Sequence, residues 1–121
     1  MCRVHDDTVV PQWSSRLVWT NLMKLAPAEG GNPGGSILET QRKDGWRLLR
    51  HELAELAPRR VLILAGRWWF EPFVRPLRLD VEWRDALVVG IANELDRRFV
   101  IAGHPRGKPR AILTEVVAAF G

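Results

Sequence analysis

The sequence contains a run of five consecutive apolar residues, Val61 to Ala65, which is closed by Gly66. A strand covered on both faces of a parallel sheet has this uniformly apolar character, because neither of its faces meets water. A membrane-spanning helix needs a far longer apolar stretch, of about 20 residues. The run therefore predicts a buried strand in a layered α/β domain, and we expect no membrane span.

Strand-like and helix-like segments alternate along the rest of the chain. Residues 17–22 have the apolar and β-branched character of a buried strand, and the Gly/Pro-rich residues 26–35 indicate a loop. Ser36, with Glu39 three residues later, matches a capping box, which predicts a helix to about Ala57. Further along, the pattern predicts a short helix, two strands and a last helix, at 68–74, 87–92, 99–102 and 109–121.

This order of elements predicts a three-layer α/β/α fold with a small, mostly parallel sheet. The polar residues 93–98 between the last two strands indicate either a turn or a fragment of helix. Gly45 lies on the apolar stripe of the first predicted helix, and we expect it to let that helix sit close to the sheet. Residues 1–15 are interpreted as an irregular lead-in, and residues 16–121 as the α/β domain.

The composition is that of a globular protein. The chain of 121 residues is 46% hydrophobic and 26% charged, which excludes a disordered tail, a collagen-like rod and a coiled coil. No basic start is followed by an apolar stretch of 7–15 residues, so we expect no secretory signal. The single cysteine, Cys2, cannot form an internal disulfide or supply a four-thiolate cluster, so we expect a cytoplasmic location.

A basic segment near the C-terminus carries the first candidate site. The formal net charge is +4, and residues 97–110 contain five basic side chains and no acid after Asp96. Within it, His104 follows a predicted strand and has the chemistry to donate a hydrogen bond to a developing anion. Arg106 and Lys108 have the charge to hold phosphates, and the next helix adds the positive end of its dipole. The alternative interpretation is a basic surface turn.

An asparagine at the end of the first predicted strand carries the second candidate site. The amide of Asn21 offers donors and an acceptor, which suits the edge of a nucleobase. The alternative is an asparagine that caps its own loop. Because Asn21 and His104 both follow the carboxyl ends of predicted strands, we expect them to line one crevice.

Other chemistry-bearing residues give weaker signals. Trp68-Trp69-Phe70 is interpreted mainly as core packing, with base stacking as the alternative. His5 and His51 have no metal-ligand spacing with His104 or Cys2, and we expect no metal site. The glycine-rich residues 30–35 match neither phosphate-binding motif.

Taken together, residues 18–120 resemble the uracil-DNA glycosylase superfamily. Residues 19–27, which end in Asn-Leu-Met-Lys-Leu-Ala-Pro, followed by Gly31-Asn32-Pro33, are similar to the strand and Asn/Pro loop of that family. Residues 58–66 look like its segment of proline, basic residues, strand and glycine. His104-Pro105 stands where the family has its histidine–proline loop.

The resemblance implies an enzyme of base-excision DNA repair that flips uracil out of DNA and hydrolyses its N-glycosidic bond, without a cofactor. Asn21 matches the residue that reads the base edge, and His104 the residue that hydrogen-bonds the uracil carbonyl as negative charge builds. The remaining matching positions contact the DNA backbone or form the loops around the base, namely Lys24, Arg106 and Lys108 in the first group, and Asn32, Pro33 and Pro105 in the second.

Two features of the family have no counterpart here. The family has an earlier strand and a loop that positions water, whereas only sixteen residues precede Leu17. The cysteines of its iron–sulfur members are also missing. Two functions therefore stay open: an active glycosylase, or a catalytically deficient nucleic-acid-binding or vestigial domain. A missing first strand predicts a low melting temperature, self-association, or completion of the sheet by another chain.

Overall fold

The computed structural model describes residues 18, 20, 22, 34–104 and 106–121. These form three helices and four strands in mixed order. The helices are α1 (Gly35–Leu56), α2 (Gly66–Val74) and α3 (Ala111–Phe120). The strands are β1 (Arg60–Ile63), β2 (Val81–Trp83), β3 (Val88–Glu94) and β4 (Arg97–Ala102). The fold is thus α/β, as predicted.

The sheet is mixed, so the prediction of a mostly parallel sheet is wrong. Among the described strands the order is β1-β4-β3-β2, and of these only β1 and β4 are adjacent and parallel. β3 runs antiparallel to both of its neighbours. The cause is the short β3–β4 connection: Glu94 pairs with Arg97, which leaves a two-residue turn, and such a turn joins only antiparallel strands. Residues 93–98, left open between turn and helix, are therefore a hairpin tip.

Leu95 occupies an unusual position in that tip. Its φ is +53°, a left-handed conformation that disfavours side chains with a Cβ, and its side chain is fully exposed. Two-residue hairpin turns usually use Asn or Gly for this geometry. The sequence therefore lacks the local signal by which a hairpin is normally recognised.

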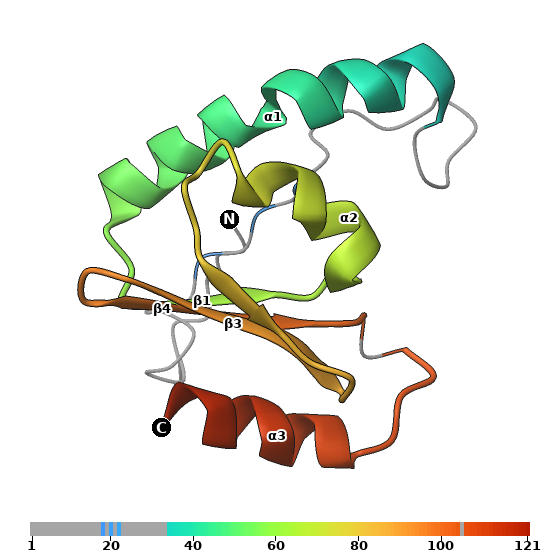
Figure 1. The fold of residues 1–121 in the computed structure, drawn as a ribbon, viewed down its shortest axis with the longest axis vertical. Coiled ribbons are helices and arrows are strands. Elements are labelled where there is room, and N and C mark those ends of the chain that lie inside the picture. The colour runs from blue at the N-terminus through green and yellow to red at the C-terminus, as the bar shows by residue number, and fades with distance from the viewer. Residues whose placement is uncertain (1–17, 19, 21, 23–33, 105) are drawn as a thin grey trace, which may run out of the picture.

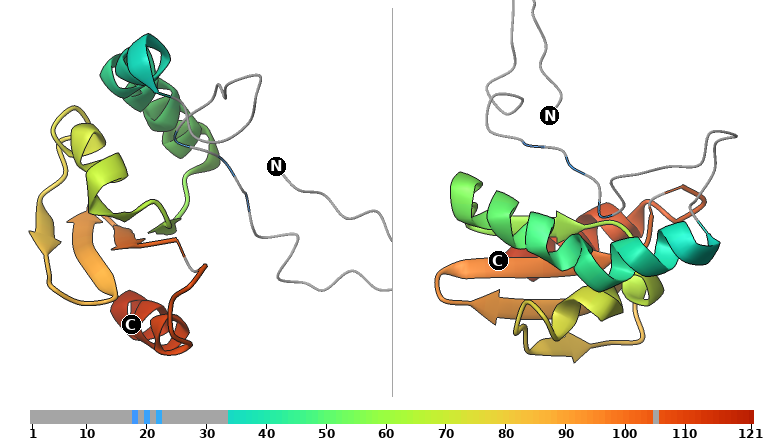
Figure 2. Two further views of the ribbon diagram at one scale, coloured as in Figure 1. Left: turned by 90° about the vertical axis from the view of Figure 1, so that its right-hand side faces the viewer. Right: turned by 90° about the horizontal axis from the view of Figure 1, so that it is seen from above.

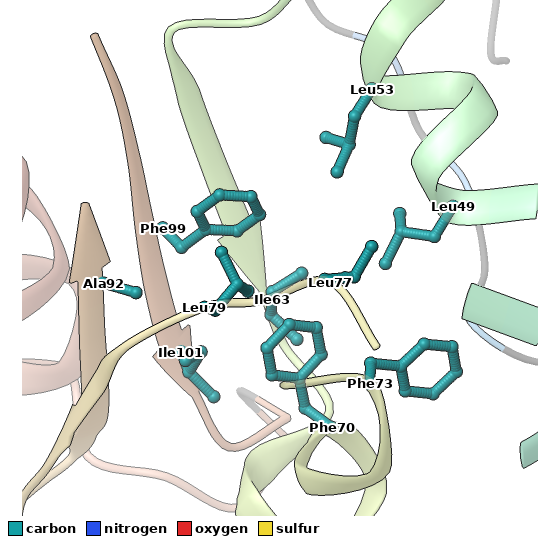
Figure 3. Close-up of a cluster of buried hydrophobic side chains, with 10 residues drawn as sticks. All are labelled: Leu49, Leu53, Ile63, Phe70, Phe73, Leu77, Leu79, Ala92, Phe99 and Ile101. Atoms are coloured by element: carbon teal, nitrogen blue, oxygen red, sulfur yellow. The ribbon is translucent and has the colours of Figure 1, made fainter. Parts of the chain in front are cut away.

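Helices cover both faces of the sheet. Figures 1 and 2 show α1 and α2 on one face and α3 on the other. On the first face, side chains from α1, α2, β1 and β4 form the main core, drawn in Figure 3. Its most buried members are Phe70, Phe73, Phe99 and Ile101, and the rings of Phe70 and Phe73 stack with centroids 5.9 Å apart. On the second face, Val88, Ile91 and Val100 pack against Val116, Ala119 and Phe120 of α3.

The start of α1 differs from the prediction. The helix begins at Gly35, so Gly34 is its N-cap and the proposed capping box at Ser36 does not form. At the other end Ala57 adopts a left-handed conformation, and its N–H donates to Leu53 O at 2.9 Å. Pro58 follows, as the sequence predicted for the helix end.

Gly45 brings α1 close to α2 rather than to the sheet. A Cβ built on Gly45 would lie 3.5 Å from Phe73 Cε1 and 3.7 Å from the carbonyl oxygen of Leu22. Leu22 itself is half-buried against the main core. Most of the predicted strand 17–22 lies outside the described residues. Among the helices that the structure describes, none is long and apolar enough to cross a bilayer.

Candidate functional site

The carboxyl ends of β1 and β4 meet at one edge of the sheet. The two strands are parallel, and each is followed by a glycine at this edge. Gly66 begins α2 with φ +75°, and a Cβ on it would lie 3.9 Å from the Cα of Gly103, which follows β4. The N-terminus of α2 therefore lies directly beside the end of β4, where the loop of His104 begins.

His104 is exposed on this loop, and its ring is held by the backbone. The N–H of Arg106 donates a hydrogen bond to Nδ1 of His104 at 3.1 Å. A neutral imidazole whose Nδ1 accepts carries its proton on Nε2. The side chain therefore presents an N–H donor on the nitrogen that the loop leaves uncovered.

Lys108 folds back over the end of β4. A Cβ built on Gly103 would lie 3.2 Å from Lys108 Cε and 3.6 Å from its Nζ. The flexible end of the Lys108 side chain, with its ammonium, therefore lies beside the end of β4.

The surroundings of the loop are cationic. Arg106, Lys108 and Arg110 are exposed, and residues 103–110 contain no acid. The first turn of α2 also lacks a carboxylate, so nothing on that turn opposes the positive end of its dipole. Together, the loop and the helix end form a surface suited to phosphate or another anion.

Asp85 brings a carboxylate to the same edge. β2 is antiparallel to β3, which is antiparallel to β4, so β2 runs in the direction of β4. Asp85 follows β2 and is exposed at this edge. The sequence shows this aspartate but gives no partner for it, because the direction of β2 is a tertiary property.

The predicted site residues are only partly described. The structure places Arg106 and Lys108 on the loop of His104. Five others, Asn21, Lys24, Asn32, Pro33 and Pro105, lie outside the described residues. The convergence of Asn21 with His104 therefore stays a prediction.

The aromatic triplet 68–70 is divided between core and surface. Phe70 is fully buried, Trp69 is half-buried, and Trp68 in the first turn of α2 is 59% exposed. The two indoles meet edge to face, with centroids 4.8 Å apart. The prediction of packing therefore holds for Phe70, while Trp68 adds an exposed aromatic ring to the helix that begins at the carboxyl edge.

The part of the chain that the structure describes contains no group of three His, Cys, Asp or Glu side chains that could hold a metal ion. Comparison with protein-family models, with curated proteins and with solved structures finds no match to this chain.

Proposed function

We propose that the chain binds DNA at the carboxyl edge of β1 and β4 and acts there as a uracil-DNA glycosylase-like protein on a flipped uracil. The observation that carries the proposal is the hydrogen bond from Arg106 N–H to His104 Nδ1, which leaves a donor on Nε2. The cations of the same loop supply the attraction for a phosphate backbone.

Cleavage of the N-glycosidic bond leaves negative charge on the departing base. In this proposal the Nε2–H of His104 donates to the base oxygen on which that charge develops. A single preorganised donor of this kind typically contributes about 10²–10³ in rate. Asp85, at the same edge of the sheet, is the carboxylate that we assign to activation of the attacking water.

The second candidate function is DNA binding without hydrolysis. The loop of residues 103–110 has cations and an imidazole but contributes no carboxylate of its own. Asp85 follows β2, which is two strands away from β4 in the sheet. If no carboxylate reaches the attacking water, the same surface binds a flipped base without cleaving it.

The test is incubation of the protein with single- and double-stranded DNA that contains one uracil, followed by alkali. For an enzyme we expect alkali-labile sites that disappear in His104→Ala and fall strongly in Asp85→Asn. His51→Ala is the matched control, because His51 is an exposed histidine on α1. DNA binding that persists without any cleavage favours the second function, and the absence of DNA binding at low salt excludes both.

A further inference from the structure

β1 forms one edge of the sheet, and among the described strands only β4 pairs with it. Arg98 N–H donates to Arg59 O at 2.8 Å, so Arg59 and Val61 direct their backbone groups towards β4. Backbone groups alternate in direction along a strand, so the N–H and C=O groups of Arg60 and Leu62 point to the open edge. This edge therefore offers two donors and two acceptors to a further strand.

Apolar side chains lie on both faces of the sheet at this edge. Leu62 is 42% exposed, and it pairs with Val100, which packs against α3. Directly paired residues share a face of the sheet, so Leu62 lies on the side of α3. Val61 lies on the opposite face, half-buried against the main core. A strand that pairs here would therefore meet an apolar side chain on each face.

The beginning of β1 is cationic. Arg59 and Arg60 are both exposed, and neither forms an ion pair within the described part of the chain. Arg60 pairs with Arg98 of β4, and Arg97, which precedes Arg98, already forms an ion pair with Glu94. Two guanidinium groups without a carboxylate therefore lie where a neighbouring strand would pass.

The charges distinguish between two kinds of neighbouring strand. A second copy of β1 would bring two more arginines to the edge and no acid, because residues 59–63 contain none. Charged side chains on an edge strand oppose pairing of this kind between identical edges. Carboxylates at the same positions would instead form charge-assisted hydrogen bonds with Arg59 and Arg60. The edge thus favours an acidic strand over a second copy of the chain.

We propose that β1 binds an extended acidic segment of a partner protein, which joins the sheet as an additional strand. The segment runs antiparallel to β1, since antiparallel ladders are the more stable per residue. Its apolar residues lie opposite Leu62 and Val61, and its carboxylates lie opposite Arg60 and Arg59. Read from its N-terminus, the segment therefore has apolar residues followed by two acids. No residue to which we assign DNA binding or catalysis belongs to β1, so this inference does not depend on the proposed function.

The experiment is fluorescence anisotropy with a labelled peptide amide of the sequence Thr-Ile-Leu-Val-Glu-Glu, and with two N-methylated forms of it. Methyl groups on the Leu and the first Glu replace the N–H groups that would face β1. We expect this form to bind at least about 10-fold more weakly, because two hydrogen bonds are lost. Methyl groups on the Val and the second Glu would face away from β1 and should change binding little. Equal effects of the two forms overturn the proposal, and so does the absence of binding by the unmodified peptide.

Leu62→Pro tests the same hydrogen bonds from the side of the protein. Proline removes the N–H of Leu62, which points away from β4, and edge strands tolerate proline at such positions. We expect peptide binding to weaken about 3- to 10-fold while the circular dichroism spectrum stays the same. Unchanged binding to the folded variant overturns the proposal. If the variant does not fold, the N-methylated peptides still give the answer with the unaltered protein.

The double variant Arg59→Gln/Arg60→Gln tests the two cations. The unaltered protein should prefer the Glu-Glu peptide to its Gln-Gln counterpart by about fivefold, as two exposed ion pairs typically contribute. The double variant should bind both peptides equally. Arg75→Gln/Arg78→Gln is the matched control, because it removes the same charge from exposed arginines between α2 and β2. If the control also loses the preference, the attraction comes from net charge and the proposal is overturned.

Sedimentation of the protein alone distinguishes an acidic partner from a second copy. We expect a monomer. A dimer that Leu62→Pro dissociates would show that two β1 edges pair with each other, and would overturn the proposal. His104→Ala should leave peptide binding unchanged, so a failure of the proposed function in the uracil assay does not affect this test.

Discussion

The backbone of Gly90 lies against the indole of Trp83 across the β2–β3 pair, so closely that a Cβ would stand 2.9 Å from Trp83 Cε3. It would also stand 2.9 Å from Val81 Cγ1. Neither a ring atom nor the methyl of a β-branched side chain can give way freely. We therefore expect Gly90→Ala to lower the free energy of unfolding by about 1–3 kcal/mol, measured by urea denaturation. An unchanged midpoint would show that β2 can move away from β3.

Gly45 gives the opposite expectation. A Cβ there would meet Phe73 and Leu22 at 3.5–3.7 Å, which is ordinary van der Waals contact. Glycine inside a helix costs about 1 kcal/mol relative to alanine. Gly45→Ala should therefore raise the free energy of unfolding by up to about 1 kcal/mol in the same assay. A loss of stability would mean that α1 and α2 approach more closely than these distances.

The hairpin tip offers a second route to stabilisation. Leu95 has φ +53° and a fully exposed side chain, so its replacement removes strain and sacrifices no packing. Leu95→Asn is expected to raise the free energy of unfolding by about 0.5–1 kcal/mol, because asparagine tolerates this conformation. The control is Leu113→Asn, an exposed leucine within α3, which should be slightly destabilising instead.

Arg97 joins the end of α1 to the hairpin. Its Nε donates to Pro58 O at 2.8 Å, its Nη2 to Leu53 O at 3.2 Å, and its Nη1 to Glu94 Oε1 at 3.1 Å. The side chain is only 18% exposed, so these bonds form largely away from water. Arg97→Met should lower the free energy of unfolding by about 2–3 kcal/mol.

Arg47→Met is the matched control for Arg97. Arg47 is 70% exposed and its pairing with Asp44 spans 3.9 Å, so the expected change is below about 0.5 kcal/mol. Thermal melts of the two variants provide the comparison. Equal effects would show that the bonds of Arg97 contribute no more than a surface ion pair.

The cations of the His104 loop predict a defined salt dependence of DNA binding. Arg106→Ala and Lys108→Ala should each weaken binding to duplex DNA and reduce the slope of log K against log salt by about 1. Fluorescence anisotropy between 50 and 200 mM salt, roughly the range over which such contacts are lost, measures that slope. A slope that is unchanged in both variants would show that this loop does not contact the DNA.

Local patterns were sufficient for α1, β1 and α3, because each has an apolar run or stripe of its own length. They did not predict the relative directions of the strands in the sheet. The turn at Leu95 carries no Asn-Gly or Asp-Gly pair, and β2 is three residues long with an acid at its centre. The turn therefore lacks the sequence pattern typical of a hairpin, and β2 lacks the pattern typical of a strand.

The candidate site likewise has features that the sequence predicts and features that it does not. The sequence alone locates His104 after a strand and gives Arg106 and Lys108 their charge. The hydrogen bond that orients the imidazole forms within the loop, between residues two apart. The close approach of Gly66 to Gly103 and the position of Asp85 at the same edge depend on how the strands pair. No local sequence pattern predicts these last two features, because each brings together residues that are distant in the sequence.

The two-residue connection between β3 and β4 also bears on how the chain reaches its native state. A hairpin closed by so short a loop forms within microseconds, whereas the parallel pairing of Arg60 with Arg98 must first close a loop of the whole intervening segment. We therefore expect the β3–β4 hairpin to form first and β1 to pair with it late. In that order, a substitution that destabilises the hairpin slows folding, whereas one that destabilises the pairing of β1 chiefly speeds unfolding.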